Sequence, residues 1–136
     1  MSDYTSQRPQ FVDVLGTYVF KEQTIHESFV FKEASTSTII LRADGTFIMK
    51  NILNLAGDTG IYVSRDGLIS ATGKWSIKVD SVKTSWRTKK PHWGITLTSA
   101  PESLNFIGFL GSSPPYELMI NYEEPDLDEV MLFSKK

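Results

Sequence analysis

The densest group of chemically capable side chains in this 136-residue chain is an acidic segment near the C-terminal end. Five carboxylates and a preceding tyrosine lie within eight positions: Tyr122, Glu123, Glu124, Asp126, Asp128 and Glu129. Carboxylates at this density attract basic protein surfaces and raise the rate of association with them. Their spacing does not match an EF-hand calcium loop. The segment therefore predicts either a docking surface for a basic partner or a solvated turn that keeps a sheet edge soluble.

A second segment, residues 83–93, has the opposite charge and contains no acidic residue. Its central aromatic and basic residues are Trp86, Arg87, Lys89 and Lys90. An aromatic ring beside cationic side chains is typical of surfaces that stack bases and hold phosphates. The basic cluster is confined to this segment and the net charge of the chain is −2, which argues against a nucleic-acid partner. The alternative is a basic loop that offsets the acidic one.

Residues suited to catalysis are sparse. The chain has two histidines, His26 and His92, and no cysteine, which excludes a disulfide framework and a thiolate site. A zinc site needs more donors at close spacing than these histidines offer. The sequence contains no glycine-rich loop between a strand and a helix and no nucleophile elbow. We therefore predict a protein that is not an enzyme, with no catalytic residues, no metal and no cofactor.

The elements that would position these segments are strands. Apolar and polar residues alternate with a period of two, which puts one set on a buried face. The clearest runs are residues 74–80, 93–98 and 116–122, and Asp44-Gly45 predicts a tight turn between strands at 35–43 and 46–53. Residues 54–67 are interpreted as a loop with one short strand at 61–64. Residues 80–91 are interpreted as a long turn or an irregular strand.

This pattern predicts an all-β fold of about eight strands in one domain, residues 11–136, after a flexible lead-in at residues 1–10. Successive antiparallel strands leave exposed edges unless the sheet closes, so we expect an up-and-down barrel. A two-sheet β-sandwich is the alternative. The expected inward residues, which we predict to fill the barrel, are Phe47, Met49, Trp75, Ile77, Leu97 and Phe106.

The N-terminal residues are polar and lack the basic-then-apolar pattern of a signal peptide. No apolar run approaches the roughly 20 residues that a membrane-spanning helix needs. We therefore expect a cytoplasmic protein with no membrane partner, unless a signal peptide has been removed.

Several short motifs resemble those of small bacterial lipocalin-like (calycin-like) β-barrel domains. Gly16-Thr17-Tyr18 would begin the first strand, residues 41–47 form a strand, turn and strand, and Gly73-Lys74-Trp75 opens a later strand. An acidic turn then precedes the last strand at residues 130–133. Lipocalins usually have tryptophan where Tyr18 stands. The resemblance spans roughly residues 14–134 and implies a lipocalin-type barrel.

Compact members of this group without a signal peptide include immunity proteins, which neutralise toxins delivered between competing bacteria. The resemblance implies a non-enzymatic protein that covers the active site of a cognate basic toxin such as a nuclease. The acidic segment would then pair with basic toxin residues. The alternative function is that of a lipocalin-like carrier, which holds a small apolar ligand inside the barrel.

Overall fold

The computed structural model describes residues 4–23, 37–56, 63–83, 89–100, 104, 106–121 and 130–136. Within these ranges, side chains are described except at residues 23, 53–56, 63–69, 81–83, 89–90 and 121.

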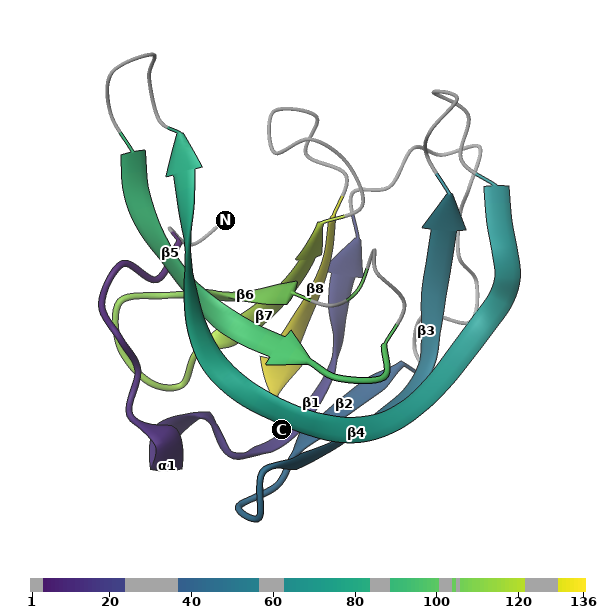
Figure 1. Cartoon of the computed structure of the whole chain (residues 1–136), viewed down its shortest axis with the longest axis horizontal. Helices are drawn as coiled ribbons and strands as arrows, with labels where there is room; N and C mark the ends of the chain where they lie inside the picture. The colour runs from purple at the N-terminus through teal and green to yellow at the C-terminus, as the bar shows by residue number, and fades with distance from the viewer. Residues whose placement is uncertain are drawn as a thin grey trace.

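Eight antiparallel strands form a single closed barrel in the order of the sequence, which confirms the predicted fold class (Figure 1). The strands are β1 (Gly16–Gln23), β2 (Thr38–Leu41), β3 (Thr46–Ala56), β4 (Val63–Lys83), β5 (Lys89–Leu97), β6 (Phe106–Leu110), β7 (Glu117–Asn121) and β8 (Val130–Lys135). A single helical turn, α1 (Phe11–Val14), precedes β1. No helix in the described ranges has the length and apolar character needed to cross a membrane. The barrel is consistent with the lipocalin-like resemblance.

The turn between β2 and β3 forms as its sequence predicts. The amide of Gly45 donates to the carbonyl of Arg42 at 3.1 Å, and Gly45 has a φ of 85°, which glycine adopts without steric cost. The carboxylate of Asp44 accepts hydrogen bonds from the hydroxyl and the amide of Thr46. These two bonds lower the pKa of Asp44, because both favour the charged carboxylate.

The long strand β4 joins two different ribbons. Its first part pairs with β3, from Val63 opposite Ala56 to Lys74 opposite Thr46. Its second part pairs with β5, from Trp75 opposite Leu97 onward for nine consecutive residue pairs. The interpretation of residues 54–67 and 80–91 as mainly loop or irregular chain was therefore wrong at their flanks. Residues 54–56 and 63–67 belong to β3 and β4, with a register shift between Leu53 and Leu55, and residues 80–83 and 89–91 belong to β4 and β5.

The inward side chains pack closely against one another. The core includes Tyr18, Phe47, Trp75 and Phe133, each with at most 5% of its surface exposed. The hydroxyl of Tyr18 is buried and donates to the carbonyl of Val14 at 2.7 Å, and burial raises the pKa of this phenol. Such packing is expected of a small barrel that its own side chains fill.

Phe106 departs from the expected inward set. Ile107 and Phe109 are the fully buried inward residues of β6, so Phe106 lies on the opposite face of the strand. Its ring meets the ring of His92 edge-on, with centroids 5.9 Å apart. The face of β6 that points out of the barrel is therefore also covered.

A second apolar cluster lies on the outer face of the last three strands. It comprises Leu110, Met119, Val130 and Leu132, each at most 4% exposed, with Tyr4 packed against it. Because the alternate residues of these strands belong to the inner core, β6, β7 and β8 are apolar and buried on both faces. This wall of the barrel is its most thoroughly packed part.

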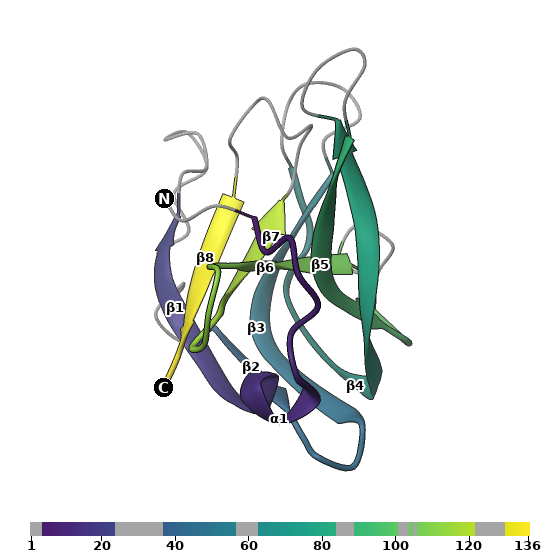
Figure 2. The same ribbon diagram turned by 90° about the vertical axis from the view of Figure 1, so that its left-hand side faces the viewer.

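The sequence predicts a flexible segment at residues 1–10. In the structure, residues 4–10 lie against the barrel (Figure 2). Strands β5 and β6 pair only over three residue pairs, and Thr5 bridges them beyond that point. Its amide donates to the carbonyl of Phe109 at 3.1 Å, and its carbonyl accepts from the amide of Trp93 at 2.9 Å. Pro9 is buried, and the Arg8 guanidinium lies over the Trp93 ring. The segment therefore completes the seam between these strands.

Candidate functional site

The predicted acidic site connects β7 to β8. Its residues, Tyr122, Glu123, Glu124, Asp126, Asp128 and Glu129, lie outside the described residues. The strands that carry the connection are described, and they pair from Leu118 opposite Phe133 to Asn121 opposite Val130. Since this stem is buried on both faces, the acidic connection begins and ends on a firmly packed part of the barrel.

Only part of the predicted basic and aromatic patch can be located. Trp86 and Arg87 lie outside the described residues. The backbones of Lys89 and Lys90 belong to β5 and pair with Lys83 and Val82 of β4. The patch is therefore carried by the end of a two-stranded ribbon rather than by a long turn. No described contact brings it together with the acidic connection.

The β4–β5 ribbon, defined here as residues 73–93, extends beyond the strands that flank it (Figure 1). On one side of the ribbon, the pairing of β4 with β3 ends at Lys74. On the other side, the pairing of β5 with β6 ends at Gly94. The residue pairs from Val79 opposite Trp93 to the ribbon's end thus have no third strand among the described residues. Among the described residues, Thr5 forms a hydrogen bond with the backbone of this part, at Trp93.

Charge is divided sharply between this ribbon and the rest of the chain. Residues 73–93 contain six lysines and arginines and one aspartate, which gives a formal charge of +5. The remaining residues contain eight basic and fifteen acidic side chains, which gives −7. The formal charge is therefore divided unevenly along the chain, although its net value is only −2.

Sequence reasoning missed the extent of this charged element. It recognised the cluster at 83–93 but separated it from Lys74 and Lys78, because Asp80 and the expected turn lay between them. A count made over the whole hairpin would have shown the division. That count required knowing that residues 80–83 continue β4.

His92 is buried at the base of the ribbon, with 4% of its surface exposed. Its ring stacks on Tyr4 with centroids 4.1 Å apart, and Nε2 donates to the carbonyl of Phe109 at 3.3 Å. Burial lowers the pKa of His92, while the Phe109 bond and the charge of Asp80 oppose this shift less strongly. We interpret His92 as a neutral packing residue that holds Tyr4 in place.

The depressed pKa of His92 predicts that acid destabilises the fold. An unfolded histidine binds a proton near pH 6.5, whereas folded His92 binds it only at lower pH. The unfolded state therefore binds more protons, and the free energy of unfolding should fall as the pH is lowered from 7 toward 5. Urea denaturation at several pH values measures this slope. His92→Phe, which retains an aromatic ring against Tyr4, should have a smaller slope, and equal slopes would contradict this role.

The described residues offer no cluster suited to metal binding. No group of three or more histidine, aspartate or glutamate side chains converges within the described ranges. His26 lies outside them. The expectation of no metal and no catalytic residues therefore remains a prediction.

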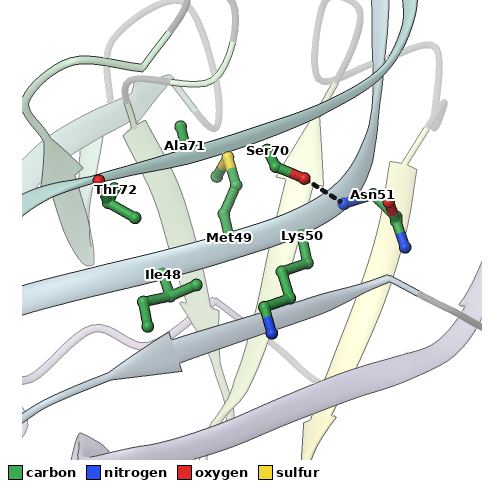
Figure 3. Close-up of a pocket in the computed structure, with 7 residues that line it drawn as sticks. All are labelled: Ile48, Met49, Lys50, Asn51, Ser70, Ala71 and Thr72. Atoms are coloured by element: carbon green, nitrogen blue, oxygen red, sulfur yellow. Dashed lines mark hydrogen bonds between the residues drawn. The ribbon is translucent and has the colours of Figure 1, made fainter.

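An open depression of about 380 Å³ lies over the β3–β4 ribbon (Figure 3). It adjoins an irregularity in β3, where Asn51 has a φ of 55° and its amide donates to the hydroxyl of Ser70 at 3.3 Å. Lys50 is the only titratable side chain in its lining. General acid–base chemistry usually requires a positioned donor and acceptor, and this lining supplies no such pair.

Comparisons of the chain with known protein families, with curated proteins and with solved structures found no match. We therefore infer the function from the geometry and charge of the molecule alone. The two features that distinguish it are the rigid stem of the acidic connection and the basic β4–β5 ribbon.

Proposed function

We propose that the protein is a non-enzymatic protein-binding domain that acts in the bacterial cytoplasm. More specifically, we propose an immunity protein that neutralises a cognate basic toxin, such as a nuclease, by covering its active site. The acidic connection, residues 122–129, would form the centre of the interface. Tyr122 would supply an aromatic contact beside the carboxylates.

The observation that carries this proposal is the packing of the β7–β8 stem. Leu118 and Phe133 are fully buried on the inner face, and Met119 and Leu132 are buried on the outer face. A stem packed in this way holds the two ends of the connection in place, so that the stem itself needs no ordering on binding. A stem that is packed on both faces supports a role for its connection in recognition.

The packing of the barrel interior supports binding at the outer surface rather than the carriage of a ligand. The inward residues Phe47, Met49 and Ile95 have no exposed surface. A carrier would need a cavity of several hundred Å³ between such side chains. Native mass spectrometry distinguishes the two functions, because a carrier would retain an apolar ligand after gentle purification.

Charge supports a basic partner for the acidic connection. Outside the β4–β5 ribbon the chain has a formal charge of −7. A nuclease must present a cationic surface to hold phosphates, and this surface would be attracted to a body of that charge. Charge complementarity of this kind increases the association rate and selects the partner.

We predict that the double variant Glu123→Lys/Glu124→Lys associates with the toxin at least about tenfold more slowly at low salt. The partner is first identified by affinity capture from the native host and then shown to lose its toxicity at one-to-one stoichiometry. Stopped-flow fluorescence measures the association rate over a range of ionic strength.

Asp13→Lys is the control, because Asp13 lies on α1 beside Lys135, at the end of β8 opposite the connection. It should change the rate much less than the double variant does. Rates that are equal for the two variants, or insensitive to salt, would remove the acidic connection from the interface. A captured partner without toxic activity would refute the immunity role.

A further inference from the structure

One edge of β4, called here the open edge, has no paired strand among the described residues along the β4–β5 ribbon. The last described hydrogen bond on this edge runs from the amide of Trp75 to the carbonyl of Gly45 at 2.9 Å. From Ser76 to Val79, no described strand pairs with this side of β4, since β5 occupies the other side. Figure 2 shows β4 at the margin of the molecule in this region.

The direction of the backbone groups on this edge follows from the ladder. The amides of Trp75 and Trp93 both donate away from the β4–β5 ladder, to Gly45 and Thr5 respectively. Backbone groups alternate in direction along a strand, so those of Ile77 and Val79 also point away from β5. The open edge therefore presents two amides and two carbonyls in the arrangement that a further strand requires.

The two faces beside this edge differ in chemistry. Lys74 and Lys78 lie on the outer face and are exposed. Ile77 and Val79 lie on the opposite face, where Val79 has 49% of its surface exposed. A strand added to the edge would place alternate side chains beside the lysines and beside the apolar pair.

We propose that this edge of β4 is a strand-addition site for an extended segment of an acidic partner protein, in which acidic and apolar residues alternate. The acidic side chains lie beside Lys74 and Lys78, and the apolar ones cover Ile77 and Val79. The main chain of the segment pairs with the backbone of Ile77 and Val79. The charge of +5 on the ribbon favours such a segment over a neutral or basic one.

The same observations favour a protein over a nucleic acid. A phosphate backbone would contact the lysines, but it has no amide groups to pair with the open strand edge. Nor does it offer aliphatic side chains to cover Val79. The charge of −7 on the rest of the chain also repels a long polyanion.

This inference is independent of the proposed function. The ribbon selects an acidic segment, whereas the acidic connection between β7 and β8 selects a basic surface. The site can bind its partner whether or not the protein neutralises a toxin. Its test uses no toxin, so failure of one proposal leaves the other standing.

The test uses a synthetic capped peptide of alternating glutamate and valine, eight residues long, and the full-length ¹⁵N-labelled protein. A peptide of the same composition, with four glutamates followed by four valines, is the matched control. We expect the alternating peptide to shift the amide signals of Ile77 and Val79 and to bind at least about tenfold more tightly than the control. A 12-nucleotide oligo(dT) should bind more weakly than the alternating peptide.

Two variants test the geometry of the site. Val79→Pro removes an amide that faces the open edge and leaves the β4–β5 ladder intact, so affinity should fall about tenfold. Val79→Thr keeps the amide and the β-branched shape, and it should lose less. Lys78→Glu should weaken binding and reduce its dependence on salt, which provides a readout even if the proline variant unfolds.

The proposal is overturned if the alternating and control peptides bind equally or if neither binds. In the second case the lysines only protect an exposed edge from aggregation. Preferential binding of oligo(dT) would also overturn it and would assign the ribbon to nucleic acid. Unchanged affinity in folded Val79→Pro would exclude pairing at this edge.

Discussion

Replacing Trp75 with alanine is expected to lower the free energy of unfolding by about 3–5 kcal/mol. Trp75 is 5% exposed, and its ring lies parallel to that of Phe11 with centroids 5.0 Å apart. Its indole Nε1 donates to the carbonyl of Arg42 at 3.1 Å. The substitution therefore removes a large buried surface, leaves a cavity and removes one of the two hydrogen bonds to the Arg42 carbonyl at the β2–β3 turn. Urea denaturation followed by circular dichroism measures the change.

Two milder variants separate the parts of this effect. Trp75→Phe keeps an aromatic ring against Phe11 but loses the indole hydrogen bond, which should account for about 1 kcal/mol of its cost. Phe11→Ala removes the stacking partner, but Phe11 is 47% exposed, so its cost should be well below that of Trp75→Ala. A loss below about 1 kcal/mol for Trp75→Ala would contradict its place in the core.

Trp75 also illustrates why the fold class was predictable from sequence. Its strand alternates apolar and polar residues over positions 74–80, and such alternation is seen where one face of a sheet is buried. Asp44-Gly45 identified a turn from backbone chemistry alone. Closure of the barrel followed from the need to remove exposed edges.

The sequence pattern did not predict the segments in which a strand has no buried face or has both faces buried. Residues 80–83 continue β4 in a two-stranded ribbon, where no core imposes alternation on the sequence. Phe106 was expected among the inward residues, yet it lies on the outer face of β6, which His92 and Tyr4 cover. Thr5 completes the barrel through its backbone, which carries no signal in the side-chain pattern.

The candidate sites divide in the same way. The acidic connection could be recognised in the sequence because its charged residues are close together. These residues lie outside the described ranges. The open edge at Ile77 and Val79 was not visible, because it depends on where pairing with β3 ends. A sequence specifies which residues alternate, whereas the length of each partner strand decides which edges stay open.

Substituting Gly94 with alanine is expected to destabilise the protein by about 3 kcal/mol, at the upper end of the range for overpacking. Gly94 pairs with Gly108 in the ladder that joins β5 to β6. A Cβ at Gly94 would lie 2.4 Å from the carbonyl oxygen of Ile107 and 2.7 Å from the ring of Phe106. The carbonyl belongs to the backbone and cannot move aside unless the two strands separate.

Separation of these strands would disturb most of their ladder, because it comprises only three residue pairs. Gly45→Ala is the matched control: Gly45 has a φ of 85° but no atom within 4 Å of the added Cβ. Its cost should be about 1 kcal/mol, from backbone strain alone. Hydrogen exchange should then show faster exchange at Ile95 and Ile107 in Gly94→Ala only. Equal costs for the two variants would mean that the seam yields easily, and that the bridge made by Thr5, rather than the β5–β6 ladder, holds this side of the barrel closed.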